Sequence, residues 1–234
     1  MTDLLYEGKA KRIYSTDKTE VLRVAYKDDA TAYNGEKHAI LTGKGKLNNA
    51  ISTIIFEMLT NAGVDNHFIE RISETEQLVK AVSIIPIEVV VRNLAAGSMA
   101  KRLGLEEGRP LKQPIVEFYY KRDDLGDPLI TVDHVYDLEL ATPEEVETLQ
   151  SNALKVNDIL TNYFSGFNIK LVDFKLEFGR SKETGEVLLA DEVSPDTCRL
   201  WDKTTGERLD KDVFRRNIGN LQDAYGKLLE RIGG

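Results

Sequence analysis

The clearest hydrophobic pattern lies in residues 171–179, where apolar and polar side chains alternate. In an extended segment every second side chain points to the same face. One face of this predicted strand is apolar and carries Val172, Phe174, Leu176 and Phe178. The other face carries Asp173, Lys175 and Glu177. A polar loop that contains Gly185 leads to a second apolar run at residues 187–190, so the pattern predicts a β-hairpin.

The predicted hairpin brings two carboxylates together. If residues 183–185 form a three-residue loop, Glu177 faces Asp191 across the two strands. Directly opposed carboxylates repel each other. A divalent cation between them turns this repulsion into binding, because hard cations prefer oxygen ligands. The hairpin therefore predicts a metal site at Glu177 and Asp191.

The other hydrophobic patterns predict a mixture of strands and helices. Strand patterns occur at residues 4–14, 21–26, 78–82 and 84–91. Helical patterns occur at residues 47–59, 94–103, 142–164 and 212–232. Gly63 is placed to end the first helix, and a capping box at Thr142 begins the third. Because strands and helices do not alternate regularly, we predict an α+β fold with an internal boundary near residues 83–86.

Composition excludes several classes of protein. The 234 residues include 31 basic and 39 acidic ones, and the net charge of −8 argues against broad binding to nucleic acid or membrane surfaces. No apolar run approaches the roughly 18 residues of a membrane span, and residues 1–7 contain no apolar signal core. Cys198 is the only cysteine, which rules out an internal disulfide and favours a reducing cytoplasm.

Common short motifs for catalysis are missing. The segment 43–46 reads Gly-Lys-Gly-Lys but lacks the spacing of a phosphate-binding loop, and neither H-E-x-x-H nor G-x-S-x-G occurs. His38, His67 and His134 lack metal-ligand spacing, so we interpret them as surface or structural residues. Cys198 has no histidine or second cysteine nearby in the sequence and is interpreted as structural.

Three segments carry candidate binding chemistry. On an extended strand, Lys9 and Lys11 share a face beside Gly8 and suit phosphate oxygens, although spacing alone favours a solvated strand face. Arg92 ends an apolar strand and Ser98 opens a helix. This predicts an anion site, with an ion-paired structural arginine as the equal alternative. Residues 191–202 follow a predicted strand, contain a proline, and combine four acids with an arginine and the only tryptophan, which is typical of a functional loop.

These segments resemble a known family. Residues 84–98 and 171–179 are similar, in this order, to the two signatures of the SAICAR synthetase family. Residues 7–11 and 191–202 are also similar to that family, so the resemblance covers essentially the whole chain. It implies a two-lobed α+β fold related to ATP-grasp enzymes and protein kinases. ATP is then expected in the cleft between a strand-rich lobe, residues 1–84, and a larger lobe, residues 85–234.

The resemblance also implies an activity. Members of the family are ATP-dependent ligases of purine biosynthesis that join carboxyaminoimidazole ribonucleotide to L-aspartate. ATP and Mg²⁺ convert the carboxylate to an acyl phosphate, and the products are SAICAR, ADP and phosphate. The resemblance implies a cytoplasmic homodimer that binds these small molecules and neither nucleic acid nor membrane.

Site residues follow from the same resemblance. It implies ATP binding by Gly8, Lys9, Ala10, Lys11, Ile84 and Lys121. It implies substrate binding by Arg92, Gly97, Ser98, Asp173, Asp196 and Arg199. It implies catalytic roles for Lys175, Glu177 and Asp191, the latter two as Mg²⁺ ligands.

Two other functions remain open from the residues alone. A kinase-like phosphotransferase would share the ATP cleft and the acidic pair, but H-R-D, D-F-G and G-x-G-x-x-G are missing. A catalytically silent nucleotide-binding scaffold would leave the motif positions without a role, although every one of them is occupied. Release of ADP that requires both the imidazole nucleotide and aspartate would distinguish the ligase from both.

Overall fold

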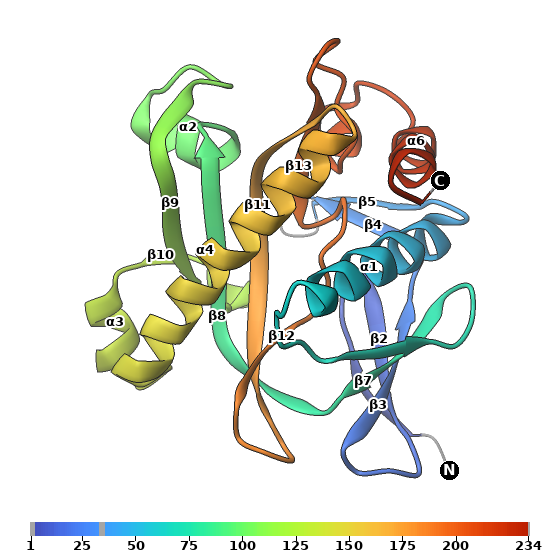
Figure 1. The fold of residues 1–234 in the computed structure, drawn as a ribbon, viewed down its shortest axis with the longest axis vertical. Coiled ribbons are helices and arrows are strands. Elements are labelled where there is room, and N and C mark those ends of the chain that lie inside the picture. Colours follow the sequence, from blue (N-terminus) through green and yellow to red (C-terminus); the bar gives the residue numbers. More distant parts are fainter. Residues whose placement is uncertain (1–2, 33–35, 234) are drawn as a thin grey trace.

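Two antiparallel sheets form the framework of the protein (Figure 1). The computed structural model describes residues 3–32 and 36–233. The first sheet has the order β1-β2-β3-β7-β6 and is formed by Leu4–Glu7, Lys11–Ser15, Val21–Tyr26, Glu76–Lys80 and Phe68–Arg71. The second sheet has the order β10-β9-β8-β11-β12, with β13 also paired to β11. Its strands are Leu129–Ile130, Pro110–Tyr120, Val82–Leu94, Ile169–Ser181, Val187–Ala190 and Cys198–Asp202. A separate small hairpin is formed by β4, Asp29–Ala32, and β5, Lys37–Ile40.

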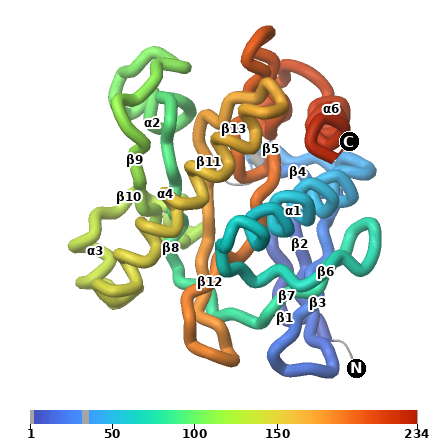
Figure 2. The backbone as a smooth tube through the Cα atoms, in the orientation of Figure 1, coloured from blue at the N-terminus to red at the C-terminus, as the bar shows by residue number. Residues whose placement is uncertain are grey.

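The helices cover the two sheets and join them. They are α1 to α6 in chain order: Lys44–Asn61, Gly97–Leu103, Val132–Asp137, Pro143–Gly166, Asp212–Arg216 and Leu221–Gly233. Helix α4 lies across β8 and β11, and α1 packs on the first sheet and on α6 (Figures 1 and 2). One continuous apolar core therefore includes Ile55 of α1, Leu160 of α4 and Leu228 of α6. Among the described helices none is long and apolar enough to cross a membrane.

The α+β class is confirmed, and several predicted boundaries hold. Gly63 has a left-handed backbone directly after α1, as expected for a helix end. The capping box at Thr142 is present, because its hydroxyl accepts from the amide of Glu145 and the Glu145 carboxylate accepts from the amide of Thr142. The change from the first sheet to the second falls between Lys80 and Val82. The division into lobes at residue 84 stays a prediction.

The predicted first strand, residues 4–14, is wrong as one element. It is divided into β1 and β2, which pair antiparallel around a turn closed by the bond from the Gly8 amide to the Lys11 carbonyl. Lys9 therefore lies in the turn and Lys11 at the start of β2, so the two side chains do not share a strand face. Lys9 pairs with Asp123, whereas Lys11 points to Asp191. Gly8 was the sequence signal for this turn, because a glycine inside an apparent strand often indicates a break.

The predicted hairpin register is wrong by one residue. Glu177 faces Ala190 and not Asp191, because Arg180 pairs with Val187 and the loop between the strands contains one residue more than expected. Asp191 follows the end of β12 in a left-handed conformation, with φ of 59°. Its carboxylate still meets the same lysine as Glu177, so proximity is achieved by this backbone turn and not by strand pairing.

Two predicted helices also differ from the structure. The helix expected at residues 212–232 is interrupted between α5 and α6, where Asn217 is left-handed with φ of 54°. The helix expected to begin at residue 94 begins at Gly97, because β8 continues to Leu94 and pairs there with β9. Asn217 ends α5 as an αL residue, a role for which Asn is the usual substitute for glycine.

Candidate functional site

A cavity of about 370 Å³ lies where the second sheet meets the β1–β2 turn, β4 and the α5 region. The predicted residues that line it are Lys9, Arg92, Ser98, Asp173, Lys175, Asp196 and Arg199. Among these lining residues the basic side chains outnumber the acidic ones, and Lys211 and Arg215 of the α5 region add two more cationic side chains. A protein with net charge −8 thus concentrates positive charge in one hollow, which suits anionic small molecules.

Two arginines and one aspartate form what we call the arginine pocket, together with Ser98. Arg92 on β8 donates to the Asp173 carboxylate at 2.5 Å, and Arg199 on β13 donates to the same group at 2.8 Å. Arg92 also donates to the Ser98 hydroxyl at 3.2 Å and to the Tyr119 hydroxyl at 3.0 Å. Register explains this meeting, because Asp173 on β11 pairs with Arg92 on one side and Arg199 on the other. The two guanidinium groups are thereby held in fixed planes toward the cavity.

Gly97 permits the close approach of Arg199 to the beginning of α2. It has a left-handed backbone with φ of 54°, and a Cβ atom there would overlap the Arg199 guanidinium. Arg199 has little freedom to move away, because Asp212 accepts from its Nε at 3.0 Å while Asp173 holds its Nη1. Glycine at this position is therefore required by both backbone conformation and space.

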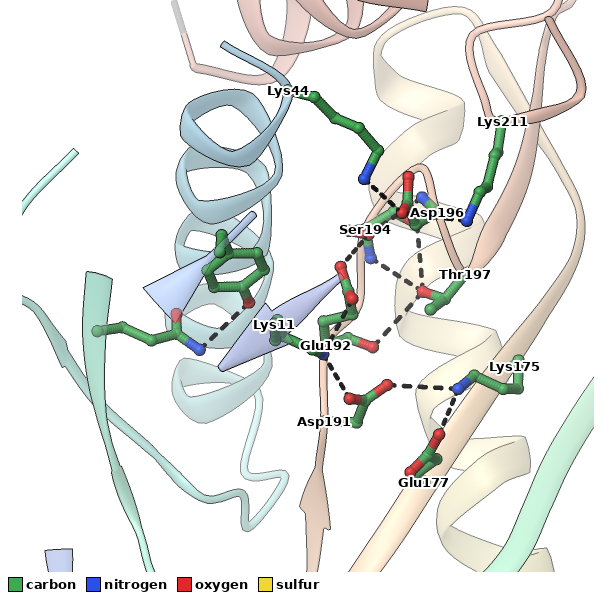
Figure 3. A network of polar contacts seen from close by, with 12 residues as sticks. Lys11, Lys44, Lys175, Glu177, Asp191, Glu192, Ser194, Asp196, Thr197 and Lys211 are labelled. Carbon is green, nitrogen blue, oxygen red and sulfur yellow. Dashed lines mark hydrogen bonds and ion pairs between the residues drawn. The ribbon is translucent and has the colours of Figure 1, made fainter. Parts of the chain in front are cut away.

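A second group of charges lies where β12 ends, at the open end of the β11–β12 hairpin, and we call it the lysine–carboxylate cluster. Its members are Lys11, Lys121, Lys175, Glu177 and Asp191. Lys175 contacts Glu177 and also lies 3.3 Å from Asp191, as Figure 3 shows. Lys121 lies 2.9 Å from Glu177, and Lys11 contacts Asp191.

Electrostatics keep this cluster charged. Burial alone would raise the pKa of Asp191, but Lys11 and Lys175 outweigh it and hold the pKa well below its usual range. Burial alone would lower the pKa of Lys175, but Glu177 and Asp191 raise it well above its usual value. The Asp191 carboxylate and the Lys175 ammonium are therefore ionised together at neutral pH.

The donor set of this cluster is compatible with Mg²⁺. Within residues 3–32 and 36–233 no group of three or more His, Cys, Asp or Glu side chains is arranged to hold a metal. Mg²⁺ does not need such a cage, since it commonly takes one or two carboxylates together with waters and substrate phosphates. Glu177 and Asp191 both reach the Lys175 ammonium, so their oxygens converge on one position that a cation favours.

Asp196 belongs to a buried cluster of polar side chains, of which only Asp196 itself was predicted from the sequence as a site residue. Its carboxylate accepts from Lys44 at 2.7 Å, from Lys211 at 3.3 Å and from the Tyr225 hydroxyl at 2.5 Å. Figure 3 shows Lys44 and Lys211 approaching Asp196 from different elements. Burial raises the pKa of Asp196, but Lys211 and Lys44 outweigh this and hold the pKa well below its usual range. In the sequence, Lys44 could have been noticed from the Gly-Lys-Gly-Lys segment at residues 43–46, although this segment is not a phosphate-binding loop.

The remaining predicted ATP-binding residues, Gly8, Ala10 and Ile84, are not among the residues that line this cavity. Gly8 and Ala10 flank Lys9 in the turn between β1 and β2, and Ile84 is 39% exposed on β8. Cys198 is buried beside the cavity, and burial raises the pKa of its thiol, in agreement with a structural role.

The α+β fold of two sheets thus carries a cavity lined by paired arginines and by Lys175 of the lysine–carboxylate cluster, which is typical of a protein that binds small anionic molecules. The family model of SAICAR synthetase matches residues 4–232, and the chain belongs to this family. The resemblance inferred from the motifs is thus confirmed over nearly the whole chain.

Individual relatives agree with this assignment. A phosphoribosylaminoimidazole-succinocarboxamide synthase from Halalkalibacterium halodurans is 63% identical over 230 residues, which cover 98% of this chain and 97% of the relative. The crystal structure of the enzyme of that name from Ehrlichia chaffeensis superposes with a TM-score of 0.97 at 46% identity, covering 99% of this chain and 98% of that one. A SAICAR synthetase in complex with ADP gives a TM-score of 0.94 at 48% identity, covering 97% and 96% of the two chains.

Proposed function

We propose that this protein is an ATP-dependent carbon–nitrogen ligase that joins carboxyaminoimidazole ribonucleotide to L-aspartate, giving SAICAR, ADP and phosphate. The observation that carries the proposal is that Arg92 and Lys175 line one cavity. A phosphorylated substrate anchored at the arginines can therefore present another group to the lysine–carboxylate cluster. The family membership and the ADP bound to a relative support the same reaction.

In this proposal the arginine pocket holds the phosphate of the imidazole nucleotide. Arg92 and Arg199 present planar donors, Ser98 adds a hydroxyl, and Gly97 leaves room for Arg199. Asp173 keeps both guanidinium groups in place, and Asp196, which lines the same cavity, is the further proposed substrate contact. Fixed donors lose little conformational entropy when the substrate binds.

The ATP side of the cleft is proposed to lie between residues 1–84 and 85–234. Gly8, Lys9, Ala10 and Lys11 would contact the phosphates, Lys121 would approach them from β9, and Ile84 would pack against the adenine. Glu177 and Asp191 are the proposed Mg²⁺ ligands. When bound, the ion neutralises charge on the phosphates and favours their orientation for transfer.

The chemistry proceeds by two displacements. An oxygen of the substrate carboxylate attacks the γ-phosphorus, the bond to the bridging oxygen breaks, and ADP leaves. The amine of aspartate then attacks the acyl carbon, and phosphate leaves with the oxygen that came from the carboxylate. The amine gives up a proton as the amide forms. We assign to Lys175, which lines the cavity and contacts Glu177, the stabilisation of the negative charge that develops on the phosphoryl oxygens.

An isotope experiment tests the ligase reaction directly. The substrate carboxylate is labelled with heavy oxygen, and the phosphate released in the presence of ATP and aspartate is analysed by mass spectrometry. Transfer of one labelled oxygen into each released phosphate is expected. Unlabelled phosphate, or phosphate retained on a hydroxyl acceptor, would refute the ligase and favour the kinase-like alternative. Lys175→Met should slow the transfer more than it weakens ATP binding.

We further propose a homodimer in the cytoplasm, following the family resemblance. Sedimentation velocity on the purified protein measures the assembly, and a monomer at micromolar concentration would contradict it. Fractionation of the source cells measures the location.

A further inference from the structure

Asp191 has a backbone conformation that its own side chain does not favour. Its φ of 59° lies in the left-handed region, which non-glycine residues adopt at a cost, although Asp tolerates it better than most. The position matters, because this turn at the end of β12 directs the carboxylate to Lys11 and Lys175. Surrounding contacts must therefore hold the backbone of Asp191 as well as its side chain.

The contact on the backbone comes from a histidine that lies far away in the sequence. His67 Nε2 lies 3.1 Å from the carbonyl oxygen of Asp191, and the ring is only 5% exposed. The backbone of His67 is fixed on both sides, since its amide donates to Leu189 and its carbonyl accepts from Lys80 at the end of β7. The ring also packs against Phe56 of α1, with the ring centres 5.4 Å apart.

Of the two neutral tautomers of the ring, only one satisfies this contact. The Asp191 carbonyl can only accept, so Nε2 must carry the hydrogen and donate it. Burial, followed by the nearby positive charge of Lys11, lowers the pKa of His67 to about 4. The neutral ring is therefore held as the Nε2–H tautomer by this contact.

We propose that His67 is a positioning residue for the metal site: its Nε2–H bond to the Asp191 carbonyl keeps Asp191 left-handed and its carboxylate turned toward Lys11 and Lys175. The role in metal binding rests on the proposed function. The bond also ties the segment beside β7 of the first sheet to the end of β12 in the second. A second-layer bond of this kind typically changes metal affinity or activity by about 10- to 100-fold when it is removed.

Nuclear magnetic resonance of the ligand-free protein gives the first test. With ¹⁵N-labelled histidine at about pH 8, where an ordinary histidine is neutral, the His67 ring should be present as the Nε2–H tautomer. The backbone carbon shifts of Asp191 should report a left-handed residue. His67→Asn cannot place a donor at the Nε2 position and should shift Asp191 out of that conformation, whereas His67→Gln can and should retain it.

Binding of ADP with and without Mg²⁺, measured by calorimetry, gives the second test. His67→Asn should weaken the Mg²⁺-dependent part of ADP binding by about tenfold or more and leave metal-free binding unchanged. His67→Gln should restore most of it. Phe56→Leu is the matched control, because it loosens the same packing without removing the bond. It should lower the melting temperature and leave Mg²⁺ dependence intact.

The outcomes separate this inference from the proposed function. A His67 ring protonated on Nδ1, or an unchanged Asp191 backbone in His67→Asn, would overturn the positioning role without any ligand present. If the Mg²⁺-dependent part of ADP binding is equal in His67→Asn and Phe56→Leu, His67 contributes only to packing. Failure of the wild-type protein to bind ADP would refute the proposed function instead, while the ligand-free resonance data would still decide the role of His67.

Discussion

The arginine pocket and the lysine–carboxylate cluster serve one cavity but are built differently. In the arginine pocket, Arg92 and Arg199 share a single buried acid, Asp173, and each guanidinium has further fixed partners. In the lysine–carboxylate cluster, Lys175 is shared between Glu177 and Asp191. A guanidinium is a rigid planar fork, whereas an ammonium on a flexible stem is a mobile point charge.

This difference suggests two modes of binding. The arginine pocket is preorganised, and a phosphate can bind to donors that already point into the cavity. In the lysine–carboxylate cluster the Lys175 ammonium lies against both carboxylates that we propose as metal ligands. On this proposal a metal held by both carboxylates takes the place of the ammonium, and a lysine side chain can move aside without disturbing the strand that carries it. Variants in the two regions should therefore have different effects.

The largest expected effect is that of Glu177→Gln in the lysine–carboxylate cluster. The change keeps the shape of the side chain but removes a charge from the proposed metal site, so kcat should fall by about 100-fold or more. Steady-state kinetics over a range of Mg²⁺ concentrations measures this loss. Glu183→Gln in the exposed loop of the same hairpin is the control and should be neutral. Near-normal turnover and Mg²⁺ dependence in Glu177→Gln would remove Glu177 from the metal site.

Arg92→Lys should have the next largest effect and should act on one substrate only. Lysine keeps the charge but loses the fork that contacts Asp173 and Ser98. A hydrogen bond to a charged group is worth about 1.5–3 kcal/mol, so the KM for the imidazole nucleotide should rise about 10- to 100-fold. The KM for ATP should change little. Equal damage to both KM values would assign Arg92 a structural role or a place on the ATP side.

A pair of glycines at the two ends of α2 gives a finer test of preorganisation. Gly97 and Gly104 both have left-handed backbones, with φ of 54° and 62°, but only Gly97 lies against Arg199. Alanine at either position should cost about 1–2 kcal/mol of stability for the backbone alone. Only Gly97→Ala should also raise the KM for the imidazole nucleotide severalfold. Chemical denaturation and kinetics on both variants measure these effects, and an equal KM in the two would show that Arg199 adapts freely.

The smallest expected effect is a dependence of the free energy of unfolding on pH, caused by Asp210 beside the arginine pocket. Asp210 is buried and accepts from the amides of Leu200 and Asp212, next to Arg199. Burial, and then the negative charge of Asp212, raise the pKa of Asp210 to about 7. The folded chain thus holds this proton more tightly than the unfolded chain, in which a carboxyl titrates near pH 4.

The sign of the pH dependence follows from this shift. The stabilising proton is fully present below about pH 4, and its contribution is lost as the pH rises through about 7. The free energy of unfolding of the wild type, measured against Asp210→Asn, should therefore decline across this window. Urea denaturation at several pH values measures it, with Asp158→Asn on an exposed part of α4 as the control. A difference that does not vary with pH would show that Asp210 ionises normally.

Local rules predicted the elements whose signals lie within a few residues. The capping box at Thr142 and the apolar stripe before Gly63 depend on contacts three or four residues apart, and both elements were predicted correctly. The breaks at Gly8 and Asn217 were missed, because each replaces a regular element by a short turn that the hydrophobic pattern does not mark. The hairpin register failed for a similar reason, since one additional loop residue moves every cross-strand pair.

The sequence by itself determined the class of fold, the family, and the residue types that the chemistry needs, because alternation, caps and signature motifs are properties of neighbouring residues. Only the tertiary structure decided which charges meet. Asp173 joins Arg92 to Arg199 through pairing on both sides of β11, and His67 reaches Asp191 across 124 positions of the chain. Such contacts depend on how strands pair and sheets pack, and no local pattern records them.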